Sequence, residues 1–138
     1  MSDMAFKLVA PDRVAFEGRA SLVIAVTTEG EEGILPKHAP FLAALKPGIL
    51  RANVVAGGGP SRLELATGEG FMQALPDGVT VLVDDVFAFE DVDVVQTRQR
   101  RDAALERQKA AGNDVAAFSR EQAAIDLANA KLRLTGST

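Results

Sequence analysis

The sequence has no cysteine, no tryptophan and no tyrosine, and its 138 residues include a single histidine, His38. Without cysteine the chain can form neither disulfide bonds nor thiolate metal sites, and it has no cysteine nucleophile. One histidine also leaves little material for acid–base chemistry near neutral pH, because histidine is the side chain that normally titrates there. The composition therefore argues against an enzyme, and we expect no metal or other cofactor.

An excess of positive charge is missing as well. The 15 basic and 19 acidic side chains give a formal net charge of -4, whereas nucleic-acid binding usually needs a clustered positive surface. No apolar run approaches the roughly 18 residues of a membrane-spanning helix. The first residues also lack the charged-then-apolar pattern of a secretion signal. We expect a soluble chain that binds no nucleic acid and reaches a membrane only through partners.

From residue 5 to about residue 89 the sequence consists of short β-rich runs separated by turn residues. Many short strands with turns at near-regular spacing are typical of a β-sandwich or barrel. In residues 21–27 the apolar Leu22, Ile24 and Val26 recur with the period of two that a half-buried strand requires. Further strands are expected at residues 6–9, 14–16, 49–55, 62–66 and 79–83.

Glycine and proline mark the reversals between these strands. The order Lys46-Pro47-Gly48-Ile49 predicts a type II turn, because proline presets its second position and glycine accepts a positive φ at its third. The three glycines at residues 57–59, followed by proline, predict a second reversal. Residues 67–70 and 76–78 predict two further turns.

After residue 91 the pattern becomes helical. Residues 93–111 contain no glycine or proline and are rich in good helix formers, and Gly112 can take the left-handed conformation that ends a helix. A second helix then runs to about residue 134, with Asp114 and Ser119 as alternative N-caps. The side chains expected on its packed side are Phe118, Ile125, Ala128 and Leu132.

The expected fold class is therefore mainly β plus α. A β-sandwich occupies residues 1–90, and a C-terminal antiparallel two-helix hairpin occupies residues 91–138, because a short connection favours antiparallel neighbours. The first helix carries few large apolar side chains among its arginines, which include Arg98 and Arg101. The hairpin is either a solvated appendage or an element that can leave the sandwich and extend, and both interpretations stay open.

His38 is the only conventional acid–base candidate. It lies between Pro36 and Pro40, which bar a helix and bias the loop toward extended conformations. A general base needs an orienting partner and a substrate pocket, and no triad-like spacing accompanies His38. We therefore interpret it as a structural or interface residue.

The acidic turn at residues 29–33 contains Glu31 and Glu32 and ends at Gly33. Carboxylates are hard metal ligands, but the turn lacks the alternating ligand spacing of a calcium loop, so a solvated acidic turn is expected. Gly33 is hypothesised to hold a positive φ. The glycines elsewhere lack the lysine–serine or lysine–threonine pair of a phosphate loop, which makes them turn glycines.

Residues 28–42 closely resemble the signature of ATP synthase epsilon subunits, through the order Gly-Ile-Leu-Pro-x-His-Ala-Pro at residues 33–40. The resemblance continues through the Lys-Pro-Gly at residues 46–48. Residues 67–71 and 79–82 look like later strands of that family, and residues 112–134 resemble its second C-terminal helix. The resemblance thus spans nearly the whole chain.

This resemblance implies a non-catalytic rotor subunit in the central stalk of a proton-translocating bacterial F-type ATP synthase. Such a subunit joins the gamma subunit to the c ring, as a peripheral protein on the cytoplasmic face of the inner membrane. Its C-terminal helices can reach the alpha and beta subunits and restrain ATP hydrolysis. The partner-binding residues that the resemblance implies are Glu31, Glu32, Gly33, Pro36, His38, Pro40, Phe41, Leu42 and Leu45, with Arg98 and Arg101 on the hairpin.

Some family members bind ATP through a motif of the form Ile/Leu-Asp-x-x-Arg-Ala at the start of the first helix. The matching residues 92–97 keep the aspartate as Asp93, but Gln96 replaces the arginine. Glutamine brings no charge to a phosphate, unlike a bidentate arginine. Asp93 and Gln96 are the only candidates for a nucleotide site, and we expect no ATP there. The alternative function, a free-standing nucleotide-sensing module, would require ATP binding without partners.

Overall fold

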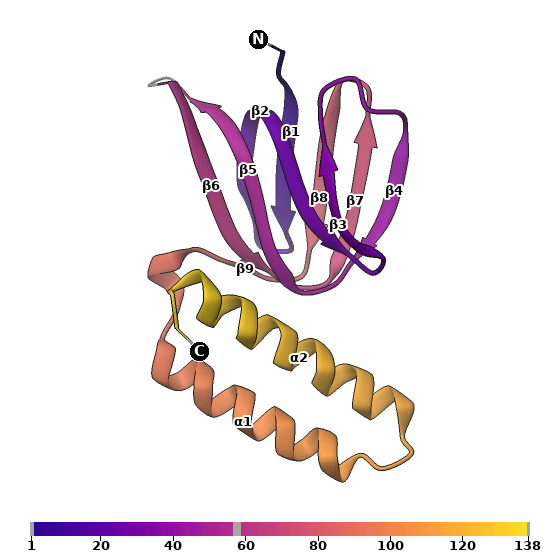
Figure 1. The fold of residues 1–138 in the computed structure, drawn as a ribbon, viewed down its shortest axis with the longest axis vertical. Helices are drawn as coiled ribbons and strands as arrows, with labels where there is room; N and C mark the ends of the chain where they lie inside the picture. The colour runs from indigo at the N-terminus through magenta and orange to yellow at the C-terminus, as the bar shows by residue number, and fades with distance from the viewer. Residues whose placement is uncertain (1, 57–58, 138) are drawn as a thin grey trace.

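The computed structural model describes residues 2–56 and 59–137, which form a β-sandwich followed by a helical hairpin (Figure 1). This confirms the expected fold class. Gly57 and Gly58 of the predicted reversal lie outside the described residues. The strands are β1 Met4–Ala10, β2 Arg13–Thr27, β3 Gly30–Ile34, β4 Phe41–Leu45, β5 Gly48–Ala56, β6 Gly59–Thr67, β7 Gly70–Leu75, β8 Gly78–Val83 and β9 Val86–Phe87. A 3₁₀ turn at Phe89–Asp91 leads to α1 Val94–Ala110 and α2 Val115–Leu134.

Strand β2 joins the two layers of the sandwich. The sequence analysis expected separate strands at residues 14–16 and 21–27, whereas the structure has one strand of 15 residues. The first part of β2 pairs with β1, its middle pairs with β5, and its end pairs with β3. The β2–β5 register shifts between Ala20 and Leu22, and such an irregularity lets a strand bend from one sheet into the next.

The remaining strand pairings complete the sandwich. The strand order is β1-β8-β7-β4-β2-β5-β6-β9, and β1 also pairs with β2. The first strand therefore lies between β2 and β8, antiparallel to β2 and parallel to β8. The core fills the space between the layers, where its largest fully buried side chains include Phe6, Leu8, Ile34, Leu50 and Met72.

The buried face of β2 differs from the expected one. The period of two is present, but the deeply buried side chains are Val23, Ala25 and Thr27. Leu22, Ile24 and Val26 are only half-buried, on the opposite face. Because β2 is apolar on both faces in this stretch, alternation alone could not tell which face meets the core.

Both helices begin at an aspartate cap. The Asp93 side chain accepts a hydrogen bond from the Gln96 backbone N–H at 3.0 Å, and the Asp114 side chain accepts one from the Ala117 N–H at the same distance. Asp114 is therefore the N-cap of α2, and Ser119 lies inside the helix. Gly112 has a φ of 59° in the connection between the helices, which confirms its expected left-handed conformation.

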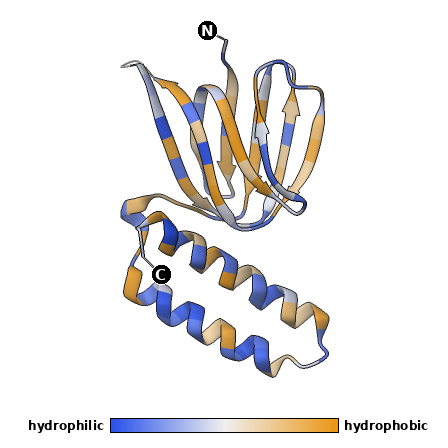
Figure 2. Ribbon diagram, viewed as in Figure 1, coloured by the Kyte–Doolittle hydropathy of each residue, from blue (hydrophilic) through white to orange (hydrophobic). Residues whose placement is uncertain are grey.

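The hairpin rests on the sandwich through α2. Ile125, Ala128, Ala130 and Leu132 are its buried residues, and α2 lies against β5 and β6. Phe118 was expected on the same side, but 47% of it is exposed. Phe118 does lie on the sandwich side, because it lines a shallow pocket with Lys46 and Pro47. Figure 1 shows that α2 lies farther from the sheet at its first turn than at its C-terminal end. Helix α1 is largely hydrophilic (Figure 2), and its buried residues are Thr97 and Ala104.

Gly48 is needed for close packing and not for a positive φ. It begins β5, and its φ lies outside the left-handed region, so the expected type II turn at residues 46–49 is wrong. A Cβ on Gly48 would lie 2.7 Å from Cγ2 of Val26, which is shorter than any ordinary contact. Gly70 is more tightly enclosed, because its Cβ would overlap the Leu82 carbonyl.

We predict that Gly70→Ala destabilises the fold by an amount on the order of 3 kcal/mol, because backbone must move to admit the methyl group. Gly33→Ala is the matched control, since the nearest atom to its added Cβ is 3.7 Å away. The control should change the free energy of unfolding by less than about 1 kcal/mol. Urea unfolding of both variants measures this. Equal stabilities would contradict the close packing at Gly70.

Candidate interaction surfaces

The loop between β3 and β4 is built on a strained turn. Pro36 holds the second position of a type II turn, and Lys37 takes a φ of 68° at the third. The His38 N–H closes the turn on the Leu35 carbonyl at 3.2 Å, and the Lys37 N–H donates to the Pro76 carbonyl at 3.0 Å. These contacts fix the loop against the β7–β8 turn although lysine disfavours this conformation.

The contacts of His38 are local and structural. Its Nδ1 lies 2.6 Å from the Ala39 carbonyl oxygen, so this nitrogen carries the proton and donates it. The ring meets Phe41 edge-on, with 5.8 Å between the centroids. Within the described residues no acidic side chain hydrogen-bonds the ring, and the arrangement orients His38 as part of a rigid loop.

The acidic turn lies at the other end of β3, beside the hairpin end of the sandwich (Figure 1). Glu31 of β3 forms an ion pair with Arg51 of β5 across the intervening strand β2, with 2.6 Å between Oε2 and the guanidinium nitrogen. Glu32 is half-buried. Gly33 does not have the hypothesised positive φ, because it is an extended residue of β3. The described residues contain no group of three or more histidine, cysteine or acidic side chains that could hold a metal ion.

The three apolar residues of β4 that the sequence analysis expected at a partner contact differ in their exposure. Leu42 projects outward with 70% of its surface exposed. Phe41 is half-buried and packs against the core. Leu45 is only 4% exposed and belongs to the core, so it is not part of any contact surface in this conformation.

An exposed apolar surface continues from Leu42 across the neighbouring strands. In the register, Leu42 lies opposite Gln73, and Phe71 lies opposite Leu82. Leu42, Phe71, Leu75 and Leu82 are all exposed and share the outward side of β4, β7 and β8. We call these four residues the apolar face.

Three members of the apolar face were not among the expected contact residues. The runs at residues 70–75 and 79–83 are mostly apolar on both sides of the strand. This pattern could have indicated an exposed apolar surface, because a strand with only one buried face usually has polar residues on the other. Which of the two sides faces solvent depends on pairing with β1 and β4, which the sequence does not display.

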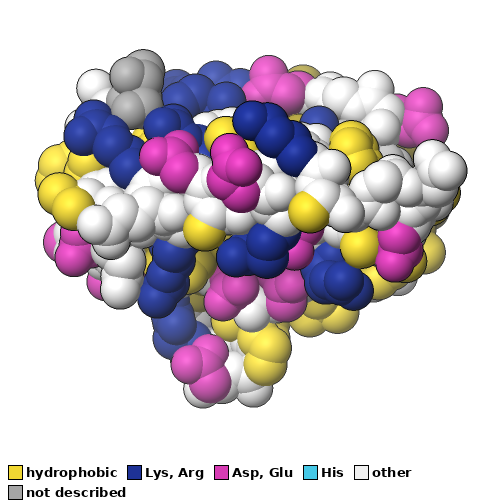
Figure 3. All heavy atoms as spheres, turned by 90° about the horizontal axis from the view of Figure 1, so that it is seen from below, with side chains coloured by type: hydrophobic (Ala, Val, Ile, Leu, Met, Phe, Trp, Pro, Cys, Tyr) yellow, Lys and Arg dark blue, Asp and Glu magenta, His cyan; other side chains and the backbone are white. Residues whose placement is uncertain are grey.

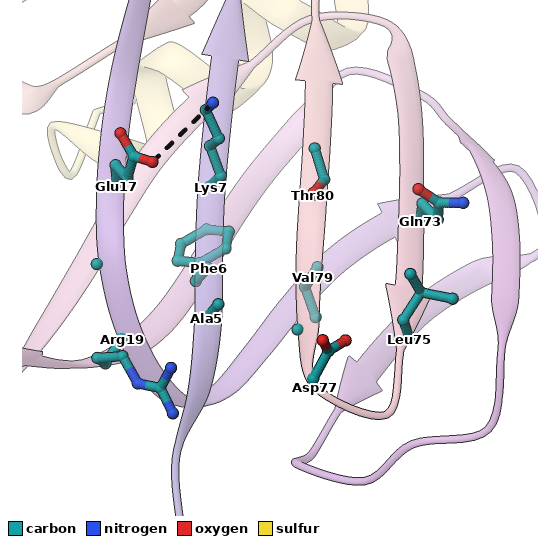
Figure 4. A pocket seen from close by; sticks show the side chains of 12 residues that line it. Ala5, Phe6, Lys7, Glu17, Arg19, Gln73, Leu75, Asp77, Val79 and Thr80 are labelled. Carbon is teal, nitrogen blue, oxygen red and sulfur yellow. Dashed lines mark ion pairs between the residues drawn. The ribbon is translucent and has the colours of Figure 1, made fainter.

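A shallow cavity of about 360 Å³ adjoins the apolar face on β1, β2 and β8 (Figure 4). Ala5 and Gly78 lie opposite each other in the register. Because neither has a large side chain, this part of the sheet surface is hollowed. Leu75 borders it on one side. The Lys7–Glu17 ion pair, 4.0 Å between the charged atoms, lies on the other side.

The hairpin carries charges of both signs. Arg98 and Arg101 lie on α1, and Arg101 pairs with Asp102 at 3.4 Å. Viewed from below, the molecule shows basic and acidic side chains side by side, with apolar side chains between them (Figure 3). Arg98 and Arg101 lie on a helix that also carries acidic side chains, and their expected contact with a partner stays a prediction.

The two nucleotide-site candidates have local roles at the start of α1. Asp93 uses its carboxylate to cap α1, and Gln96 is exposed in the first turn. A cavity of about 480 Å³ does lie between the hairpin and the end of the sandwich, with Arg100, Arg107 and Lys131 among its lining residues. Neither Asp93 nor Gln96 lines it.

Burial shifts the pKa values of two charged side chains at this cavity. The pKa of Lys131 is lowered, first by burial and then by the nearby Arg100 guanidinium, while Asp85 opposes this shift. The pKa of Asp85 is raised, first by burial and then by the negative charge of Asp84. The Lys131 ammonium also lies 4.1 Å from the centroid of the Phe87 ring.

Comparison with known proteins shows which family the chain belongs to. Residues 3–89 match the family model described as "ATP synthase, Delta/Epsilon chain, beta-sandwich domain". The chain is 35% identical over 133 residues to the ATP synthase epsilon chain of Chromobacterium violaceum, covering 96% of this chain and 93% of the relative. The chain belongs to the ATP synthase epsilon-chain family. Another member, from Moorella thermoacetica, is 33% identical over 141 residues and is covered over 99% of its length.

Solved structures show the same fold as this epsilon-family chain. A chain of the Euglena gracilis mitochondrial ATP synthase matches with a TM-score of 0.77 at 19% identity, covering 96% of this chain and 81% of that one. A chain in the central stalk and c-ring structure of the Tetrahymena thermophila mitochondrial enzyme matches with a TM-score of 0.61 at 19% identity, covering 96% of both. Among the described residues of this epsilon-family chain, no helix has the length and apolar character needed to cross a membrane.

We predict that Lys37→Gly raises the free energy of unfolding by up to about 1 kcal/mol, because glycine takes the left-handed conformation without strain. Lys37→Val should lower it, since a β-branched residue fits this φ poorly. Thermal unfolding of both variants provides the measurement. A glycine variant that is less stable than the valine variant would contradict the assigned turn.

Proposed function

We propose that this epsilon-family chain is a non-catalytic subunit of the central stalk of an F-type ATP synthase, where it joins the gamma subunit to the c ring. Two observations support the proposal. Relatives named as ATP synthase epsilon chains match this chain over nearly its full length. The apolar face offers an exposed surface on three neighbouring strands, which a separate partner can cover.

The apolar face is the observation that carries the proposal. Its four side chains project from paired strands of a sheet whose other side is the core. Such a surface is already ordered before a partner binds, so association costs little further conformational entropy. A joint that transmits torque benefits from the same rigidity. We assign the apolar face to the gamma subunit, together with Pro36, His38 and Pro40 of the adjoining loop and Phe41 at the start of β4.

The acidic turn is assigned to the c ring. Glu31 and Glu32 lie at the end of the sandwich opposite the His38 loop, as Figure 1 shows for the two ends of β3. The Glu31–Arg51 ion pair holds the turn in place while leaving the Glu31 side chain 56% exposed to a polar partner. The bacterial relatives support a peripheral location on the cytoplasmic face of the inner membrane.

The hairpin is assigned a regulatory role toward the alpha and beta subunits. It contacts the sandwich through α2, whose only large buried side chains among the described residues are Ile125 and Leu132. An element that buries few large side chains can separate from its neighbour at low cost. Arg98 and Arg101 on α1 are the residues we assign to an acidic surface on the catalytic subunits.

We predict that Phe71→Ser weakens binding to a catalytic head that carries gamma but lacks its own epsilon. The change removes an exposed aromatic side chain from the centre of the apolar face and should leave the core intact. Val115→Ser is the matched control, because it removes an exposed apolar side chain from the hairpin. Co-elution with the head at a series of concentrations measures both. Equal binding of the two variants would refute the assignment of the face.

We also predict that a chain ending at residue 90 binds the same head but permits faster ATP hydrolysis than the full chain. The sandwich keeps its contact surface, whereas the regulatory helices are gone. Steady-state hydrolysis is measured on complexes in which the amount of bound chain is equal. Identical rates with both forms bound would show that the hairpin is not a brake under those conditions.

A further inference from the structure

The hollow at Ala5 and Gly78 lies in a row of paired residues that runs across four strands. The row has the order Arg19, Ala5, Gly78 and Leu75, from β2 through β1 and β8 to β7. Its two middle members carry one methyl group and no side chain, whereas its two end members are long. The row therefore forms a depression between two walls, which belongs to the cavity of about 360 Å³ in Figure 4.

The hollow is a fixed feature of the sheet. A Cβ on Gly78 would lie 2.8 Å from the Ala5 carbonyl oxygen and 3.0 Å from the Ala5 Cβ, so the two strands leave no room for a side chain at residue 78. Phe6 and Val79, which also line the cavity, are core residues with 1% and 2% of their surface exposed. The floor of the hollow is thus apolar and held by the core.

Most charges around the hollow are already paired. Lys7 and Glu17 form the ion pair at 4.0 Å, and the Arg19 Nε donates to Asp3 Oδ1 at 2.8 Å. Asp77 lines the same cavity and is exposed, but it forms no ion pair within residues 2–56 and 59–137. The rim therefore presents one uncompensated negative charge.

These properties indicate what the hollow can hold. Its basic side chains have acidic partners of their own, so they do not call for a phosphate or carboxylate ligand. A small molecule is normally enclosed over most of its surface, whereas this hollow is shallow and lies open along the sheet. A large apolar side chain that projects from a protein partner fits the apolar floor and the Leu75 wall. The rim then excludes water around it, as polar residues do around the central contacts of many interfaces.

The hollow is continuous with the surface that we assign to the gamma subunit. Leu75 is a wall of the hollow and also a member of the apolar face. The neighbouring Pro76 carbonyl accepts a hydrogen bond from the Lys37 N–H at 3.0 Å, which ties the His38 loop to the same turn. A partner that covers both the apolar face and this loop passes directly beside the hollow.

We propose that the hollow receives one large apolar side chain of the gamma subunit, and that a basic side chain next to it pairs with Asp77. The proposal rests on the proposed function, because it names the contact that fixes the position of gamma on the apolar face. The apolar side chain supplies affinity through burial in a preformed pocket. The charge pair at the rim acts chiefly on the rate of association.

The first test fills the hollow. Ala5 is exposed, so Ala5→Phe should fold normally, which urea unfolding checks. We expect this variant to bind a catalytic head that carries gamma but lacks its own epsilon at least about tenfold more weakly than the unchanged chain. Ser61→Phe is the matched control, because it adds the same ring at an exposed position of β6 that does not line the hollow. The control should bind like the unchanged chain.

A second measurement reports burial of the hollow without blocking it. The chain has no cysteine, so Ala5→Cys and Ser61→Cys each introduce its only thiol. The head should slow the reaction of a maleimide with the thiol at residue 5 by a factor of ten or more, on the order of what a buried hot-spot position requires. The thiol at residue 61 should react equally fast with and without the head.

The role of Asp77 is tested through the rate of association. Asp77→Asn should slow binding severalfold at low ionic strength, and the difference should vanish in high salt, because rim charges are screened there. Glu64→Gln is the matched control, since it removes an exposed acidic charge that does not line the hollow. Equal rates for the two variants at low ionic strength would overturn the charge pair with Asp77.

The outcomes separate this proposal from the proposed function. If the unchanged chain does not bind the head, the proposed function fails. If it binds, but Ala5→Phe binds equally well and the thiol at residue 5 stays reactive, the hollow is not a gamma contact and the proposed function stands. Protection of that thiol in the free chain at the same concentration would identify a second copy of this chain as the occupant, which also overturns the proposal.

Discussion

The structure depends on β2 more than on any other element. This one strand pairs with β1 and β5 on its two edges and with β3 and β4 near its end. Both layers of the sandwich therefore contain part of the same 15 residues, and neither layer can shift without the other. Strand β2 also fixes the positions of the acidic turn and of the loop around His38. These two segments flank β3, and β3 pairs with β2 along its whole length.

Sequence reasoning was accurate where a residue's role is local. The Asp114 cap and the left-handed Gly112 follow from short-range backbone chemistry, and both were among the expected features. It failed at Gly48 and Gly33. Gly48 is required by the side chain of Val26 from another strand, and Gly33 is an ordinary extended residue. Such requirements arise from tertiary contacts, which single-sequence patterns do not contain.

The candidate surfaces show the same division. The resemblance to epsilon subunits indicated the family and the region around His38, and the comparisons confirmed the family. The distribution of exposure could not be predicted, because Leu42 and Leu45 have the same chemistry but opposite environments. The exposure of Phe71 and Leu82 was not predicted for a related reason, since β7 and β8 have apolar residues on both the solvent side and the core side. Partner contacts of individual residues, His38 included, remain predictions.

The parallel pairing of β1 with β8 has a consequence for synthesis on the ribosome. Ala5 meets its partner Gly78 only after most of the sandwich has been translated. Until then one edge of β1 has no partner, and the hydrogen-bonding groups along that edge are open to other chains. Closure of so long a segment is also slow, because the chain must first lose much conformational freedom. The nascent sandwich is thus most exposed to misassembly late in translation, just before the residues of the hairpin are made.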